Sequence, residues 1–182
     1  MKDLSLHILD LLQNSTVVNS TLITLDIKDS IKENIFSFCI QDNGKGMSKE
    51  FLEKVTDPYS TTRTTRKVGL GLPLIKMNAE QCNGGFDIQS QEGKGTKLSF
   101  WFEHNNIDRP PMGDLAGVFV LTIAQTEEIR FILTYQTDKD TYIFDTQEIK
   151  EALDGIPLNN NDIIKMLREM IEENLKEINA NQ

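Results

Sequence analysis

The spacing of apolar side chains predicts a helix and two strands in the first part of the chain. Residues 4–18 carry apolar side chains at helical spacing, and Asp3 is placed to cap that helix. Residues 21–28 alternate and are rich in β-branched side chains, as strands are, and residues 34–41 predict a second strand. The polar break between the two strands is short, so we expect them to pair antiparallel.

The rest of the chain continues to alternate between helical and extended patterns. A turn at residues 42–47 precedes a short helix that ends near Val55, and an irregular loop follows over residues 56–68. Pro73 suits the first turn of the next helix. The remaining expected elements are that helix to Cys82, strands 86–91 and 96–103, a polar junction over 104–114, a helix over 115–125, strands 129–136 and 140–145, and helices over 146–153 and 160–179.

Charge is unevenly distributed along the chain. Its 182 residues contain 19 Lys and Arg against 28 Asp and Glu, a net charge of −9 that disfavours nucleic acid and anionic membranes as partners. Residues 1–104 hold 12 basic and 13 acidic side chains, whereas residues 105–182 hold 7 and 15. We therefore expect a nearly neutral domain at 1–104 and a small acidic α/β region of unknown role at 105–182.

Cysteine content and hydropathy indicate the compartment. Cys39 and Cys82 lack the spacing of a metal site and fit a reducing environment. His7 and Asp10 interrupt the first apolar run, which is therefore no signal peptide, and no stretch approaches the ~20 apolar residues that span a bilayer. The sequence thus predicts a cytoplasmic protein without membrane insertion.

Three pairs of glycines indicate where the chain could bind a ligand. They occur in the order Asp42-x-Gly44-x-Gly46, Gly69-x-Gly71 and Gly93-x-Gly95-Thr96. Each pair lies where a strand or loop meets a helix or turn, so that free backbone amides can meet an anion. A Cβ would block such an approach, which explains the residue type. Each pair alone is a weak signal, and its value lies in the order of the set.

Together with Asn14 on the first helix, these pairs resemble the four sequence boxes of the GHKL superfamily: gyrase, a heat-shock chaperone, histidine kinases and mismatch-repair ATPases. The resemblance covers about residues 4–103, and residues 57–63 are similar to the P-F-x-T-T-K stretch of histidine kinases. It implies the α/β Bergerat fold, a two-layer sandwich whose mixed sheet carries helices on one face. It also implies ATP and Mg²⁺ as ligands.

The resemblance implies a role for each matching residue. Asp42 would accept a hydrogen bond from the exocyclic amine of adenine, since a carboxylate only accepts. Thr96 would join the polar network beside the base, and Asn14 would hold Mg²⁺ through its amide oxygen. The other expected nucleotide contacts are Gly44, Gly46, Arg63, Lys67, Gly69, Leu70, Gly71 and Leu72.

A basic segment fits the phosphate end of such a site. Between Lys54 and Lys76 there are five basic residues and one acid, Asp57. In an acidic chain, this segment is suited to cover a triphosphate. The stretch Lys67-Val68-Gly69 lacks the first glycine of the G-T-G-L-G-L found in many histidine kinases. The basic segment could therefore close over a nucleotide differently from theirs.

Asp10 lies one turn before Asn14 on the same helix face, where hydrolytic relatives carry Glu. It could act as a general base, or it could orient metal or water. His7 shares that face but lacks the H-E-x-x-T/N-P pattern of a phosphoacceptor, so we expect it to be packed or to support the site.

The leading interpretation is an ATP–Mg²⁺-dependent protein kinase, similar to a detached histidine kinase catalytic domain or an anti-sigma serine kinase, with its phosphoacceptor on a partner protein. One alternative is an ATP-gated module that binds a partner through the acidic region and transfers nothing. Another is an ATPase of the gyrase or mismatch-repair kind. A homodimer is also open, because the sequence does not decide the oligomeric state.

Overall fold

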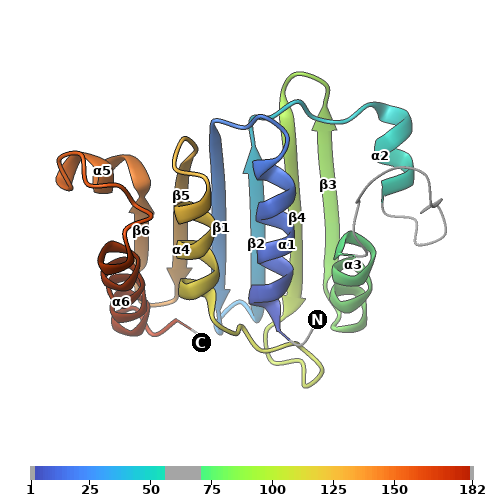
Figure 1. The fold of residues 1–182 in the computed structure, drawn as a ribbon. Helices are drawn as coiled ribbons and strands as arrows, with labels where there is room; N and C mark the ends of the chain where they lie inside the picture. Colours follow the sequence, from blue (N-terminus) through green and yellow to red (C-terminus); the bar gives the residue numbers. More distant parts are fainter. Residues whose placement is uncertain (1–2, 56–70, 181–182) are drawn as a thin grey trace.

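A computed structural model describes residues 3–55 and 71–180, and these form one mixed sheet of six strands (Figure 1). The strands are β1 (Leu22–Ser30), β2 (Ile35–Asp42), β3 (Gly85–Gln91), β4 (Gly95–Glu103), β5 (Arg130–Thr137) and β6 (Thr141–Asp145). Their order is β3-β4-β2-β1-β5-β6, with β1 and β5 parallel and every other pair antiparallel. The expected antiparallel pairing of the first two strands is confirmed.

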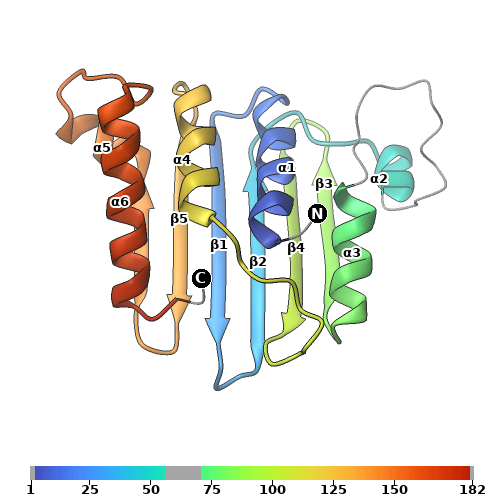
Figure 2. The same cartoon turned by 60° about the horizontal axis from the view of Figure 1, so that its bottom comes forward.

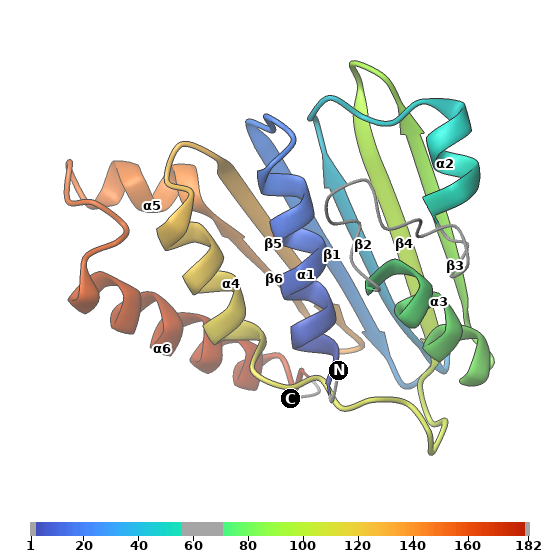
Figure 3. The same ribbon diagram turned by 45° about the vertical axis from the view of Figure 1, so that its right-hand side comes forward.

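The helices agree with the expected ranges to within a few residues. They are α1 (Leu4–Thr16), α2 (Lys49–Val55), α3 (Gly71–Gln81), α4 (Leu115–Gln125), α5 (Thr146–Ala152) and α6 (Asn161–Glu177). Asp3 caps α1 as expected, because its side chain accepts a hydrogen bond from the Leu6 amide. Figures 2 and 3 show α1, α3, α4 and α6 on the same side of the sheet, which confirms the two-layer α/β sandwich.

The core lies between this helical layer and the inner face of the sheet. Alternate residues of the central strands point inward, such as Leu25 on β1 and Phe38 on β2, and both are almost fully buried. Phe38 stacks on Phe100 of β4 with ring centroids 4.8 Å apart. Ile8 and Leu12 of α1 are completely buried against this face. The helical spacing seen in the sequence thus becomes the stripe that covers the sheet.

The acidic region 105–182, expected as an appendage, contributes two strands to the same sheet. β5 pairs with β1 along eight positions, from Leu22 opposite Arg130 to Asp29 opposite Thr137. The inward side chains of β5 are completely buried; they are Phe131, Leu133 and Tyr135. Regions of very different charge therefore share one core, while a division of the chain into domains at residue 104 stays a prediction.

A buried polar cluster fixes the junction between these regions. Asp29, at the end of β1, is 5% exposed and accepts hydrogen bonds from Nε2 of His104 at 2.8 Å and from the Tyr135 hydroxyl at 3.1 Å. Arg109 donates to the His104 carbonyl and places its guanidinium over the Phe36 ring, 4.8 Å from the centroid. The polar segment that follows β4 is thus tied to β1 and β5.

We predict that Asp29→Ala lowers the free energy of unfolding by about 3 kcal/mol, because it leaves His104 and the Tyr135 hydroxyl without their buried acceptor. Urea denaturation followed by circular dichroism measures the change. Asp26→Ala is the matched control, since Asp26 lies on the same strand with an exposed side chain and should cost less than about 0.5 kcal/mol. Equal losses in the two variants would contradict the assigned role of the cluster.

Candidate functional site

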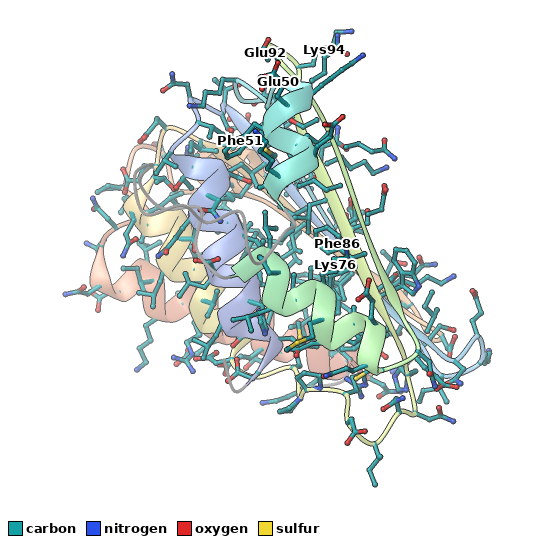
Figure 4. The ribbon with its side chains drawn as sticks, turned by 90° about the vertical axis from the view of Figure 1, so that its right-hand side faces the viewer. Glu50, Phe51, Lys76, Phe86, Glu92 and Lys94 are labelled. Atoms are coloured by element: carbon teal, nitrogen blue, oxygen red, sulfur yellow. The ribbon has the colours of Figure 1, made fainter. Side chains whose placement is uncertain are left out.

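A pocket of about 280 Å³ opens where α1 and β2 end, with α2 and the start of β4 beside it. Its walls are mostly apolar, and polar groups occupy a few positions among them. The lining residues are Leu11, Asn14, Ser15, Val17, Val18, Ile40, Asp42, Lys45, Gly46, Met47, Phe51, Val55, Leu72, Ile88, Thr96 and Leu98. In Figure 4, Phe51 extends from α2 on the side that faces α1. An apolar pocket with a few convergent polar groups is typical of a small-ligand site.

Asp42 is the acidic side chain in this pocket. It is the last residue of β2 and is 6% exposed. Its Oδ2 accepts a hydrogen bond from the Ser15 hydroxyl at 3.1 Å, and its Oδ1 accepts one from the Gly44 amide at 2.9 Å. Each carboxylate oxygen has a second lone pair, so Asp42 keeps acceptor capacity for a ligand that donates.

Thr96 lies directly opposite Asp42 on the neighbouring strand β4. Its hydroxyl is 2.9 Å from the Ser90 hydroxyl of β3, and the Ser90 hydroxyl also accepts from the Met47 amide at 2.9 Å. Thr96 therefore belongs to a polar network beside Asp42, while its expected place beside a base stays a prediction. Ser15 and Ser90 were not among the residues predicted for the site. The signal for Ser15 was its place directly after Asn14, whereas Ser90 had no signal beyond its place in a strand.

The glycines of the Asp42-x-Gly44-x-Gly46 motif let its loop pass close to other backbone segments. Gly46 has φ of +64°, and a Cβ there would collide with the carbonyl oxygen of Gln91. Gly44 is buried, and a Cβ there would collide with Val18, which lies just after the end of α1. Only glycine combines this φ with so close an approach, which explains the motif at Gly46.

Asn14, the expected Mg²⁺ ligand, is half-buried on α1 and lines the same pocket. The described residues contain no cluster of three His, Cys, Asp or Glu side chains that could hold a metal ion. An amide oxygen suits Mg²⁺, which commonly completes its shell with water and phosphate oxygens. The Asn14 amide oxygen is therefore a suitable ligand for such a metal ion.

Asp10 lies one turn before Asn14, against the first residue of α3. A Cβ on Gly71 would collide with Oδ2 of Asp10, so a larger residue there would displace the Asp10 side chain. That oxygen is buried and has no hydrogen-bond partner among the described residues. Burial raises the pKa of the Asp10 carboxyl, because the charged form loses solvation. A carboxyl held in this way is suited to accept or to hold a proton.

His7 lies on α1 about one turn before Asp10 and is 1% exposed. Its Nε2 is 3.3 Å from the Asn78 side-chain nitrogen on α3, and burial lowers the pKa of its imidazole. The imidazole is therefore held in its neutral form between two helices. His7 is thus packed between α1 and α3, which is one of the two places expected for it.

The structure brings together five of the residues predicted for the site, since Asn14, Asp42, Gly46, Leu72 and Thr96 all line the pocket. Gly44 and Gly71 lie beside it through the contacts described above. The other predicted residues lie outside the described part of the chain; they are Arg63, Lys67, Gly69 and Leu70. None of the described helices is long and apolar enough to cross a membrane.

Residues 2–106 match the family model described as histidine kinase-, DNA gyrase B-, and HSP90-like ATPase. The match extends over more than half of the chain. The chain therefore belongs to this family, and the resemblance seen in the sequence boxes is confirmed.

Individual relatives agree with this family. The chain is 35% identical over 74 residues to the sensor histidine kinase ZraS of Escherichia coli K12; the aligned part is 41% of this chain and 16% of ZraS. The chain thus spans only a small part of the curated relatives that it matches.

Solved structures share the fold. The ATPase domain of MutL from Aquifex aeolicus, complexed with ADP, superposes with a TM-score of 0.52 at 14% identity, covering 85% of this chain and 70% of that one. The N-terminal domain of a DNA repair protein gives 0.53 at 15% identity, covering 79% and 52%.

We predict that Asp10→Asn stabilises the protein at neutral pH. The raised pKa means that ionised Asp10 opposes folding above that pKa, and the amide removes this buried charge. The midpoint of thermal unfolding should rise at pH 7, and the gain should disappear in acid, where Asp10 is protonated. An exposed carboxyl, Asp87, provides the control: Asp87→Asn should leave the midpoint nearly unchanged. A loss of stability in Asp10→Asn at pH 7 would show that the carboxylate is favourably solvated or paired.

Proposed function

We propose that this member of the histidine kinase-, DNA gyrase B-, and HSP90-like ATPase family binds ATP with Mg²⁺ in the pocket and transfers the γ-phosphate to a protein partner in the cytoplasm. One observation carries the proposal. An acceptor carboxylate on β2, a hydroxyl opposite it on β4 and an amide side chain on α1 line one pocket with apolar walls.

The carboxylate end of the pocket suits adenine. Asp42 already receives one hydrogen bond at each oxygen, and its remaining lone pairs favour a ligand edge that donates, such as the exocyclic amine. Apolar side chains from several elements offer surface to a flat base; Met47, Ile88 and Leu98 are among them. The base would thus be held by one oriented polar contact and by burial of its faces.

The α1 end of the pocket suits the phosphates. Asn14 would hold Mg²⁺, which would supply charge neutralisation on the phosphate oxygens. Gly71 begins α3, so backbone amides of that helix start are proposed to meet phosphate oxygens, together with Arg63, Lys67, Gly69 and Leu70. Phosphoryl transfer depends mainly on such positioning and charge stabilisation.

The phosphoacceptor is proposed to lie outside these 182 residues. The chain contains two histidines: His7 is 1% exposed, and the side chain of His104 is 12% exposed and paired with Asp29. Neither imidazole is open to a γ-phosphate. In the proposed reaction the bond between the γ-phosphorus and its bridging oxygen breaks, a nucleophile on a partner protein takes the phosphoryl group, and ADP leaves.

We predict that Asp42→Asn lowers the affinity for ATP by roughly tenfold to a hundredfold. The Gly44 amide needs an acceptor, so the new amide oxygen turns toward it, and the new NH₂ group then faces the donor amine of adenine. Titration calorimetry measures the affinity, and Asp26→Asn on the exposed side of β1 is the control. Unchanged ATP binding by folded Asp42→Asn would overturn the proposed adenine site.

The kinase activity is tested by incubating the chain, ATP labelled at the γ-phosphate, Mg²⁺ and a cytosolic extract. We expect labelled partner protein with the wild-type chain and little with Asn14→Ala or Asp42→Asn. ATP labelled at the α-phosphate is the matched control, since it reports binding without transfer. Lability of the label in acid indicates a phosphohistidine, whereas lability in alkali indicates a phosphoserine.

The alternatives give different results in this experiment. An ATP-gated binding module retains a partner in a nucleotide-dependent way, labels nothing and is insensitive to Asp10→Asn. An ATPase releases free phosphate without labelled protein, and the release depends on Asp10. Nucleotide binding together with either of these results would refute the kinase proposal.

A further inference from the structure

Three polar side chains lie in a row across the sheet at one end of the pocket. Ser90 on β3 is directly opposite Thr96 on β4, and Thr96 is directly opposite Asp42 on β2. Asp42 and Thr96 are among the described lining residues, whereas Ser90 lies behind Thr96, on the side away from Asp42. Ser90 is thus placed to act on a ligand through its neighbour rather than by contact.

The Ser90 hydroxyl makes three short polar contacts. It lies 3.0 Å from the Gly95 carbonyl oxygen and 2.9 Å from the Thr96 hydroxyl, and it accepts a hydrogen bond from the Met47 amide at 2.9 Å. A hydroxyl has one proton and two lone pairs. Because a carbonyl oxygen can only accept, the Ser90 proton belongs to the contact with Gly95. Otherwise the lone pairs of two oxygens would face each other at that distance.

The remaining contact then fixes the direction of the Thr96 hydroxyl. Ser90 uses its proton on the Gly95 carbonyl and one lone pair on the Met47 amide, so it offers Thr96 its second lone pair. Thr96 therefore donates to Ser90 and keeps its own lone pairs. In this arrangement each of the three contacts carries one proton, as is usual for part-buried polar groups.

Asp42 presents the same kind of surface to the pocket. The Ser15 hydroxyl and the Gly44 amide each donate to one of its oxygens. These donors are used within the protein, as is the Thr96 hydroxyl. Asp42 and Thr96 consequently meet a ligand with acceptor lone pairs, and we call the two together the acceptor surface.

We propose that Ser90 is a positioning residue for nucleotide selection. It takes up the Thr96 proton and so keeps donors away from the acceptor surface formed by Asp42 and Thr96. That surface then favours a purine with an exocyclic amine over a purine without one, because the amine supplies the donors that the surface needs. This inference rests on the proposed function, since it names what sets the selectivity of the same site.

Loss of the Ser90 hydroxyl leaves the Thr96 proton without its acceptor. The proton then turns toward the pocket, where it meets the amine hydrogens of adenine, or toward Asp42, where it occupies a lone pair that the amine would use. Both changes lower the contribution of the amine to binding. The Met47 amide also loses its acceptor, but Met47 belongs to an apolar wall that every purine nucleotide would share.

Titration calorimetry of the full chain with Mg²⁺ and two nucleotides tests the proposal. The nucleotides are ATP and purine riboside triphosphate, which lacks the exocyclic amine, and the ratio of their dissociation constants measures what the amine contributes. We expect this ratio to fall about fivefold or more in Ser90→Ala and to recover in Ser90→Thr, which restores the hydroxyl. Ser99→Ala, on the opposite face of β4, is the matched control and should leave both dissociation constants unchanged.

A double variant shows whether Ser90 acts through Thr96. In a Thr96→Val background no hydroxyl proton is left to redirect, so adding Ser90→Ala should not lower the ratio further. An equal fall in both backgrounds would overturn the proposal. An equal loss of affinity for both nucleotides in Ser90→Ala, with the ratio unchanged, would also overturn it and leave Ser90 as a support for the Met47 segment.

The behaviour of the wild-type chain separates this inference from the proposed function. A chain that binds both nucleotides equally well would refute the selectivity while leaving a nucleotide site in place. A chain that binds neither would refute the proposed function and this inference together.

Proton NMR of the wild-type chain without nucleotide gives a readout that needs no variant. The Thr96 hydroxyl proton and the Met47 amide proton would point at the same Ser90 oxygen. A nuclear Overhauser effect should therefore connect the two protons, and the hydroxyl proton should exchange slowly with water. A Thr96 hydroxyl proton that exchanges freely and shows no such effect would contradict the arrangement, whatever the pocket binds.

Discussion

The carboxylate of Asp42 is the constraint on which the pocket depends. A buried carboxylate must be satisfied by hydrogen bonds, and here the donors come from α1 through Ser15 and from the following loop through Gly44. Thr96 faces it from β4. One side chain thus ties the end of a helix to the loop that follows β2. Because these elements also supply the apolar walls, the pocket and its acceptor group are set by the same contacts.

The continuity of the sheet gives the acidic region a structural role. β5 lies parallel to β1, and α4 packs beside α1 over the shared core. The helix that carries Asn14 therefore contacts α3 on one side and α4 on the other. The acidic region thus supports, through α4, the helix that lines the pocket. The uneven charge of the chain is thus divided between two parts of one sheet.

Local pattern was sufficient to predict the helices and strands, because strands such as β2 alternate between a buried and a more exposed face and helices α1 and α6 each have one apolar stripe. The glycine motifs with Asn14 and Asp42 identified the pocket for a similar reason, since close backbone approach leaves a local signature. Parallel pairing of β5 with β1 leaves no such signature, so the shared sheet could not be predicted. Ser90 and the bond between Asp29 and His104 were also missed, because they join residues far apart in sequence.

The central claim is that the pocket binds adenine at Asp42 and metal-bound phosphates at Asn14. A crystal structure of the chain with Mg²⁺ and a non-hydrolysable ATP analogue tests it most directly. We expect the exocyclic amine of adenine within hydrogen-bond distance of Asp42, beside Thr96, and the Asn14 amide oxygen bound to the metal ion. A nucleotide bound elsewhere, or one whose base points away from Asp42, would contradict it.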